Sequence, residues 1–329
     1  MSTGNGTATR CLEAFVSIDL PLSANWAEKD LESILWLASY PRSGNTFTRV
    51  LLANYFLAGE DEFQINKLID FIPADTSDLL WADFAPSAPR SVEDTWRTRA
   101  KVFDQYRRSG KTSAFFGLKT HSANAQVAGV SGFGFRPNDR AIYVVRHPLD
   151  VLLSYCDYNG RGLDQSIEVM CTPGLFVNDA RPGALEVRGS WSEHVSSWLL
   201  TPPCPVLLIR YEELRLQPEE SLKSILSFLG APVVPDRLKY AVEAAQFDRL
   251  RRQEAANDFI ERPEGTLSGA FFRKGTSLQW LRELTPERAY RLADKCGEAM
   301  RRLGYTDPRE VFFDGRNAIG PVNLRPPNS

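Results

Sequence analysis

The sequence predicts an α/β fold with a mostly parallel sheet and helices on both of its faces. Four apolar runs have the length of buried strands, at residues 34–38, 114–118, 141–145 and 206–209. Helical patterns lie between and after these runs, at residues 47–57, 149–155, 190–200, 218–229 and 286–303. Strands that alternate with helices are joined by right-handed crossovers, which make the strands parallel. Ligands of such sheets bind at the carboxyl ends of the strands, so we look for the site there.

Single elements carry signals of their own. In the helix at residues 218–229, Leu222, Ile225, Leu226 and Leu229 share one apolar face, and Gly230 supplies a C-terminal stop. The long segment from residue 59 to residue 110 contains three prolines at positions 73, 86 and 89. We expect it to be an irregular insertion that, together with residues 157–188, helps to wall a substrate cleft.

Composition limits the classes of function. The 329 residues are 43% hydrophobic, with a net charge of -2 and a pI of about 6.0, so no overall basic field points to nucleic acid or an anionic membrane. The five cysteines are scattered and show no CxxC spacing, which disfavours disulfides and a zinc site.

No leader pattern and no apolar run of membrane-spanning length is visible, so we expect a soluble, cytoplasmic protein. We expect a single domain at 33–310, a partly flexible extension at 1–32 and a tail at 311–329.

The loop after the first strand is a candidate phosphate site. The strand at 34–38 runs into Tyr40-Pro41-Arg42-Ser43-Gly44-Asn45-Thr46 and then into a helix. Backbone N–H groups and the positive end of a helix dipole suit a phosphate there, and Arg42 adds a charge. Ser43, Asn45 and Thr46 can donate side-chain hydrogen bonds. The alternative is an ordinary turn with a helix cap. The loop lacks the first glycine and the lysine of a Walker A motif, which makes nucleotide hydrolysis the weaker interpretation.

Two further strand ends bring polar groups to the same edge. Arg146 ends the strand at 141–145, and Ser154 follows two helical turns later; Asp150 is the alternative partner of Arg146. Lys119 and His121 end the strand at 114–118. A solitary histidine is more often structural than catalytic, and the strand-end position of His121 makes the two roles about equal. We expect His147 to cap a helix and His194 to pack.

A fourth segment, Phe271-Phe272-Arg273-Lys274-Gly275, places two cations before a glycine. Taken alone, it is more typical of a solvated loop. The basic run at residues 246–252 is likewise typical of a solvated helix face.

In order and content these segments resemble the PAPS-dependent sulfotransferase family, from about residue 34 to residue 305, where PAPS is 3′-phosphoadenosine 5′-phosphosulfate. The resemblance implies a P-loop-like, three-layer α/β/α fold with about five strands, PAPS as the donor and adenosine 3′,5′-bisphosphate as the product. It assigns nucleotide binding to Arg42, Ser43, Gly44, Asn45, Thr46, Phe47, Arg146, Ser154, Tyr211, Arg273, Lys274 and Gly275. It also implies that His121 is the catalytic histidine.

This chain departs from the family pattern at three positions. Arg42 replaces a lysine and Phe47 replaces a tryptophan, and both exchanges keep the charge or the ring. Leu278 stands where the family often has a second glycine. The closure of the segment that begins at Arg273 is therefore less certain to follow the family.

The resemblance leads to a mechanism by analogy with phosphoryl transfer. We expect His121 to act as general base, and Arg42 and Lys119 to stabilise the transferred group, without a metal. We expect the acceptor to be a small-molecule hydroxyl, with no nucleic-acid or membrane partner; the oligomeric state is open. Trp81, Phe84, Trp96, Tyr158 and Phe176 are candidates for a lipophilic acceptor pocket, although core packing is the commoner role. The rival functions are a nucleotide-dependent kinase and a non-catalytic nucleotide-binding protein.

Overall fold

The computed structural model describes residues 33–57, 62–85, 91–109, 117–177, 185–263 and 265–312. Its central sheet is parallel, as the sequence predicts, and its strand order is β2-β1-β5-β8. The strands are β1 (Leu35–Ser39), β2 (Gly117–Thr120), β5 (Arg140–Val145) and β8 (Val206–Arg210). Residues 114–116 of the predicted second strand lie outside the described residues. Within the described ranges this sheet has four strands, one fewer than the expected number of about five.

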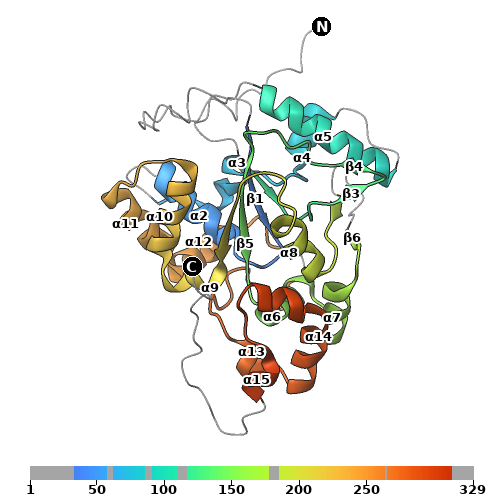
Figure 1. Cartoon of the computed structure of the whole chain (residues 1–329). Helices are drawn as coiled ribbons and strands as arrows, with labels where there is room; N and C mark the ends of the chain where they lie inside the picture. Colours follow the sequence, from blue (N-terminus) through green and yellow to red (C-terminus); the bar gives the residue numbers. More distant parts are fainter. Residues whose placement is uncertain are drawn as a thin grey trace.

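Alternating side chains of the strands divide the core into two layers. On one face, Leu35 and Leu37 of β1 pack in a cluster with helix α2 (Asn45–Phe56), α10 (Pro218–Leu229), α11 (Pro235–Ala244) and α12 (Phe247–Asn257). On the other face, Trp36 and Ala38 pack in a cluster with α5 (Val92–Arg108), α6 (Pro148–Asn159), α7 (Leu163–Cys171), α8 (Trp191–Leu199) and α14 (Pro286–Arg302). The period of two along a strand produces this division. The result is the predicted three-layer α/β/α fold (Figure 1).

The five predicted helices are confirmed as α2, α6, α8, α10 and α14. Gly230 ends α10 with a left-handed backbone, φ 67°, as predicted. Short elements complete the described chain: the 3-10 helix η1 (Ile65–Lys67), α3 (Leu68–Phe71), α4 (Asp78–Phe84), α9 (Tyr211–Leu216), α13 (Trp280–Glu283) and α15 (Pro308–Phe312). Two hairpins lie outside the main sheet, β3 (Gln126–Val127) with β4 (Val130–Ser131), and β6 (Phe176–Val177) with β7 (Glu186–Val187).

The expectation of an irregular insertion at residues 59–110 is wrong, because the segment contains the 17-residue helix α5. Ser91 caps this helix by accepting a hydrogen bond from the backbone N–H of Asp94. The buried face of α5 includes Arg99 and Arg107, which form buried ion pairs with Asp75 and Asp139. Charged residues on the buried face interrupt the apolar periodicity that would have revealed the helix.

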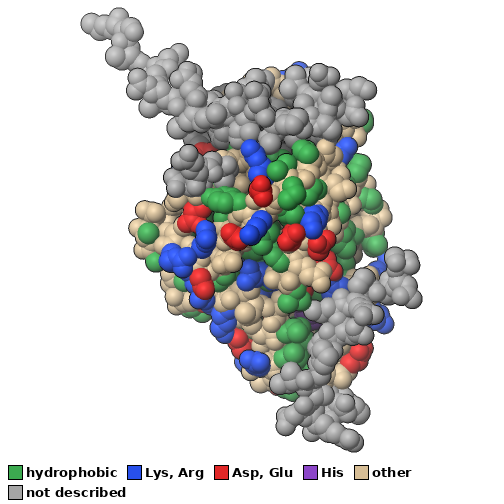
Figure 2. Space-filling model, turned by 90° about the vertical axis from the view of Figure 1, so that its left-hand side faces the viewer, with side chains coloured by type: hydrophobic (Ala, Val, Ile, Leu, Met, Phe, Trp, Pro, Cys, Tyr) green, Lys and Arg blue, Asp and Glu red, His purple; other side chains and the backbone are tan. Residues whose placement is uncertain are grey.

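The surface and the helices show two further features. Figure 2 views the side of the molecule where α11 lies in Figure 1, and there basic and acidic side chains are interspersed rather than gathered by sign. None of the helices in the described ranges is long and apolar enough to cross a membrane.

Candidate active site

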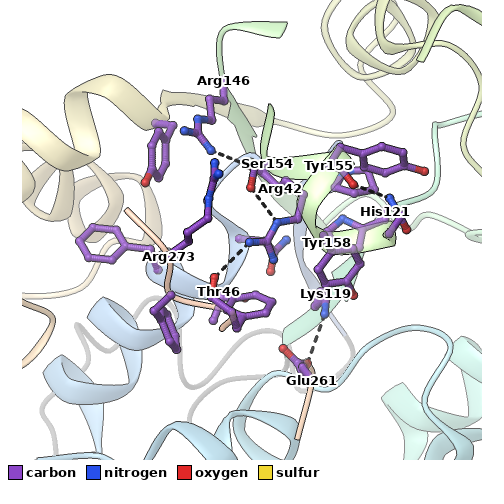
Figure 3. Close-up of a pocket in the computed structure, with 18 of the residues that line it drawn as sticks. Arg42, Thr46, Lys119, His121, Arg146, Ser154, Tyr155, Tyr158, Glu261 and Arg273 are labelled. Carbon is purple, nitrogen blue, oxygen red and sulfur yellow. Dashed lines mark hydrogen bonds and ion pairs between the residues drawn. The ribbon is translucent and has the colours of Figure 1, made fainter. Parts of the chain in front are cut away.

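A cavity of about 320 Å³ opens at the carboxyl ends of the strands (Figure 3). Its wall comes from the loop after β1, the ends of β2 and β5, helix α6 and the segment 271–279, which we call the lid. It brings together all the predicted site residues except Ser43: Arg42, Gly44, Asn45, Thr46, Phe47, Lys119, His121, Arg146, Ser154, Tyr211, Arg273, Lys274 and Gly275. Segments far apart in the sequence therefore form one site.

The loop after β1 has a backbone shaped to receive an anion. Arg42 and Gly44 both have positive φ angles, 66° and 111°. A β-carbon added to Gly44 would lie 2.5 Å from the Tyr211 ring, so both the backbone angle and the packing require glycine. Gly44 is the N-cap of α2, whose first N–H groups have no acceptor inside the helix. The helix terminus and the turn together make an anion-binding nest at the cavity.

The side chains of this loop divide between the fold and the cavity. The side-chain amide of Asn45 donates to the carbonyl of Leu37 (2.9 Å) and to the hydroxyl of Ser39 (3.3 Å). The expected donation from the Asn45 side chain to a ligand is therefore wrong, because both of its N–H groups tie the helix to β1. The Ser43 hydroxyl is buried and has no partner within the described residues. The Thr46 hydroxyl accepts from Arg49 at 3.4 Å.

Arg42 crosses the middle of the cavity. Its Nε donates to the Ser154 hydroxyl (3.0 Å), and its Nη2 donates to the carbonyl of Phe271 in the lid (3.2 Å). The guanidinium lies between the rings of Tyr158 and Phe271, 4.7 and 4.3 Å from their centroids. Burial lowers the pKa of Arg42 to about 10, so the side chain is still a cation at neutral pH. Two predicted site residues, Arg42 and Ser154, are thus in direct contact, although the sequence analysis grouped Ser154 with Arg146.

Arg146 lies over the Tyr211 ring, 4.4 Å from its centroid. It donates to the carbonyl of Arg42 (3.2 Å) and to that of Thr276 in the lid (3.1 Å). Its Nε is buried and has no partner within the described residues. Hydrogen-bonding capacity therefore remains for an anionic ligand.

Asp150 is not a hydrogen-bonded partner of Arg146. Its carboxylate accepts from the backbone N–H groups of Leu278 (2.7 Å) and Trp280 (3.2 Å), and so fastens the end of the lid to the first turn of α6. Burial raises its pKa, which Arg146 and the lid N–H groups partly offset. Leu278 itself has a φ of 62°, the left-handed conformation that its glycine-like place in the family pattern suggests.

His121 is oriented as a proton acceptor. Its Nδ1 lies 2.8 Å from the carbonyl oxygen of Ser39. Since a carbonyl can only accept, Nδ1 carries the proton and Nε2 keeps its lone pair. Burial first, and then the neighbouring Lys119, lower the pKa of His121 to about 4, so the ring is neutral at pH 7. A neutral imidazole with a free Nε2 is suited to general-base catalysis.

The other two histidines have the structural roles that the sequence predicts. His194 is fully buried; it donates from Nε2 to the carbonyl of His121 (3.2 Å) and accepts from the hydroxyl of Tyr143 (2.8 Å). It therefore holds the backbone of His121 in place. His147 caps α6 by accepting from the N–H of Leu149, and it stacks on Trp280.

Lys119 belongs to a charge cluster that the sequence did not indicate. Its ammonium lies 3.2 Å from a carboxylate oxygen of Glu261, which also forms an ion pair with the buried Arg49. Burial alone would raise the pKa of Glu261, but the two cations hold it well below its usual range. Burial lowers the pKa of Lys119, and Glu261 offsets part of that shift.

A second pair missed by the sequence analysis is Glu186 with Arg188, beside His121 in the cavity wall. Both residues lie in the segment 157–188, which was expected to help wall the substrate cleft, but no motif singled them out. Of the aromatic residues considered for an acceptor pocket, Tyr158 lines the cavity, whereas Trp81 and Trp96 are buried in the core. Phe176 is 47% exposed and Phe84 packs against the core cluster.

The lid lies against α12 and α9. Gly275 has a φ of 62°, and a β-carbon there would lie 2.4 Å from the Phe247 ring. Arg215 donates to the Gly275 carbonyl (2.8 Å). Arg273 contacts Gln279 at 3.4 Å, while the Lys274 ammonium lies 2.5 Å from Glu283. Lys274 thus lines the cavity with its charge already paired.

Two of the predicted nucleotide-binding residues, Phe47 and Tyr211, contact their neighbours through their rings. Phe47 lies under Arg215, whose guanidinium carbon is 4.9 Å from the ring centroid. Tyr211 packs on Gly44 and under Arg146, as described above. Within the described ranges, no group of three or more His, Cys, Asp or Glu side chains could hold a metal ion.

Known proteins share the sequence pattern and the fold. A family model described as "Sulfotransferase domain" matches residues 32–304. Sulfotransferase 2A2 of Rattus norvegicus is 29% identical over 158 residues, which are 47% of this chain and 54% of the relative. Flavonol 3-sulfotransferase of Flaveria bidentis is 24% identical over 268 residues, 77% of each chain. The chain thus spans about half the length of animal relatives such as the rat protein.

Two solved structures share the fold. The first is mouse sulfotransferase SULT7A1 complexed with PAP, at a TM-score of 0.52 and 20% identity, covering 85% of this chain and 89% of that one. The second is retinol dehydratase in a complex with retinol and PAP, at a TM-score of 0.50 and 14% identity, covering 85% and 84%. At these identities the likeness establishes the fold alone.

Proposed function

Because the chain belongs to the sulfotransferase domain family, we propose that it moves a sulfuryl group from PAPS to a hydroxyl group of a small-molecule acceptor. One observation carries this proposal. The anion nest at Gly44, the cation Arg146 and a histidine with a free Nε2 line one cavity at the carboxyl ends of the strands. A passive nucleotide-binding protein has no need for a base in that place. A kinase with this type of sheet would need the Walker lysine, which the loop from Arg42 to Thr46 lacks.

The donor end of the cavity fits a nucleotide with phosphates at both the 5′ and the 3′ positions. The nest after β1, with the first N–H groups of α2, suits the 5′ group. Arg146 with its unpaired Nε, together with Ser154 and Arg273, suits a 3′ phosphate. Phe47 offers a ring for the adenine. The PAP held by the mouse sulfotransferase of similar fold supports this assignment.

The catalytic step is assigned to His121 and Lys119 at the other, acceptor end, together with Arg42 of the donor end. His121 Nε2 takes the proton of the acceptor hydroxyl while the acceptor oxygen bonds to sulfur and the bond between sulfur and the bridging phosphate oxygen breaks. Arg42 and Lys119 stabilise the negative charge on the sulfuryl oxygens and on the departing phosphate oxygen. The carbonyl of Ser39 keeps the proton on Nδ1, so that only Nε2 can act.

A transfer assay tests the proposal. Radiolabelled PAPS is incubated with a panel of hydroxyl acceptors, and labelled product is expected to form at the same rate with and without EDTA, because basic side chains offset the donor charge. Calorimetry with PAP is expected to show binding to a single site. Absence of PAP binding would contradict the proposal outright, and PAP binding without transfer to any acceptor would favour a non-catalytic protein.

A further inference from the structure

The hairpin of β6 and β7 places two charged residues in the wall beside His121. Side chains alternate along a strand, so Glu186 and Arg188 point to one side and Val187 to the other. Val187 is buried in the core cluster, whereas Glu186 and Arg188 line the cavity. The sequence analysis placed both in a segment expected to wall the cleft but gave neither a role of its own, and the proposed mechanism uses neither.

Main-chain hydrogen bonds fix this wall relative to the catalytic histidine. The carbonyl of Val187 accepts from the N–H of Ala123 at 2.7 Å, two residues after His121. On the other side of the strand, the N–H of Arg188 donates to the carbonyl of Leu175 at 2.8 Å. The wall and the segment that carries the base are therefore directly hydrogen-bonded.

Only part of the Glu186 carboxylate is engaged. Its Oε2 forms an ion pair with Arg188, which also donates to the hydroxyl of Tyr155 (2.8 Å). Its Oε1 has no hydrogen bond among the described residues, although the side chain is only 15% exposed. Burial would raise the pKa of Glu186, but Arg188, His121 and Lys119 lower it to about 2. Within the part of the chain that the structure describes, the group is thus a mostly buried carboxylate with one unused acceptor atom.

We infer that Glu186 selects acceptors that carry a second hydrogen-bond donor, a hydroxyl or a protonated amine, near the hydroxyl that receives the sulfuryl group. This inference rests on the proposed function. An acceptor without such a donor displaces water from the carboxylate and leaves Oε1 unpaired, which disfavours its binding strongly. The acceptor class is therefore polyhydroxylated or amino-bearing compounds rather than simple lipophilic alcohols.

Matched acceptors test the inference. The three dihydroxybenzenes are compared with their monomethyl ethers, and tyramine is compared with 4-ethylphenol, in the radiolabelled transfer assay. At least one donor-bearing compound is expected to have a kcat/KM at least tenfold above that of its matched partner. A preference confined to tyramine would identify the amine as the donor that Glu186 binds. A preference confined to a dihydroxybenzene would identify the second hydroxyl as that donor.

Glu186→Gln links the preference to this residue. A neutral amide accepts hydrogen bonds more weakly than a carboxylate, so the preference is expected to fall at least threefold. PAP affinity by calorimetry is expected to change less than twofold, because Glu186 lies at the acceptor end. Glu298→Gln, which alters an exposed glutamate paired with Arg302, is expected to leave both quantities unchanged. If the role of Glu186 were purely structural, Glu186→Gln would lower kcat/KM by the same factor for every acceptor.

The possible outcomes distinguish failure of the inference about Glu186 from failure of the proposed function. Equal kcat/KM within every matched pair overturns the inference and leaves the proposed function standing. A preference that survives Glu186→Gln also overturns it, and so does PAP binding with no transfer to any donor-bearing compound. Absence of both PAP binding and transfer overturns the proposed function and the inference together. The comparison of acceptors on the unaltered protein is decisive even if the variant fails to fold.

Discussion

The two ends of the cavity hold their cations in different ways. At the donor end, Arg42, Arg146 and Arg215 donate to backbone carbonyls of the lid. At the acceptor end, Lys119 and Arg188 are paired with the carboxylates of Glu261 and Glu186. A hydrogen bond to a neutral carbonyl is weaker than one to a carboxylate. The donor end can thus transfer its cations to an anionic ligand, whereas the acceptor end keeps a fixed charge pattern.

His121→Ala should have the largest effect, because it removes the base from the acceptor end. We expect kcat to fall by about 10²- to 10⁴-fold, the usual contribution of a positioned general base. PAP affinity should stay within about twofold, since the donor end is intact. Steady-state transfer rates and calorimetry measure the two quantities. If the variant transferred the sulfuryl group at a near wild-type rate, the assignment of His121 as general base would be wrong.

Arg146→Ala should act mainly at the donor end. We expect the Kd for PAP to rise about 10- to 100-fold, as for the loss of a charge-assisted contact. Binding of AMP, which lacks the 3′ phosphate, should weaken much less. Calorimetric titration with each nucleotide measures the contrast, and Arg97→Ala, at an exposed pair on α5, serves as the control. Equal losses for the two nucleotides would show that Arg146 does not read the 3′ phosphate.

Glu261→Gln tests whether the charge pattern at the acceptor end is fixed. Removal of the carboxylate leaves Arg49 and Lys119 close together without their shared counter-ion, so we expect unfolding free energy to fall by about 3 kcal/mol. It should also lower the pKa of Lys119 further, because Glu261 raises that pKa in the native protein. The alkaline limb of kcat/KM should move to lower pH. An unmoved limb would mean that Lys119 does not act in the transfer step.

Lys274→Ala should matter little, although Lys274 is a predicted nucleotide ligand. Its side chain is 46% exposed and its ammonium is paired with Glu283, an arrangement that contributes about 0–1 kcal/mol. We expect the Kd for PAP to change less than threefold by calorimetry. A tenfold loss would show that Lys274 leaves Glu283 when the nucleotide binds.

The smallest change in kcat/KM is expected when the pH is lowered from 7 to 5. Because His121 has a pKa of about 4, it remains neutral, and its titration should lower kcat/KM less than about twofold. A histidine with the ordinary pKa of about 6.5 would lower kcat/KM about 25-fold. The pH–rate profile measures this, and a drop centred near pH 6.5 would contradict the buried, neutral state.

The free energy of unfolding should depend on pH between pH 7 and pH 5, although the titration of His121 changes kcat/KM little in that range. The folded pKa values of His121, His147 and His194, about 4, 3 and 3, lie below the unfolded value of about 6.5. The unfolded chain therefore binds more protons below pH 6.5, and the histidines' contribution to the free energy of unfolding decreases as the pH falls from 6.5 toward 4. Urea unfolding at pH 7 and pH 5 measures the decrease.

The donor end could be predicted from the sequence because its signals are local. A strand, a tight loop and a helix follow each other at Arg42 to Thr46, and Arg146 and Ser154 belong to one strand–helix unit. The Asn45 side chain was assigned to the wrong partner because its amide reaches back to β1, and no spacing rule records that contact.

The acceptor end could not be predicted in the same way. Glu261 meets Lys119 across 142 residues, and the contact of β7 with Ala123 brings Glu186 near His121. Such contacts depend on packing rather than on periodicity. The same reason explains why α5 was missed, since buried ion pairs occupy part of its inner face.

The carboxylate of Asp150 has a consequence for how this chain can vary. Leu278 adopts a backbone conformation that is unfavourable for a branched residue, and such strain persists only where the surroundings impose it. Asp150 imposes it by binding the N–H groups on both sides of the strained turn. We therefore expect the two positions to be coupled: Asp150→Ala should lower the free energy of unfolding more with leucine at 278 than with glycine there, which a double-mutant cycle measures.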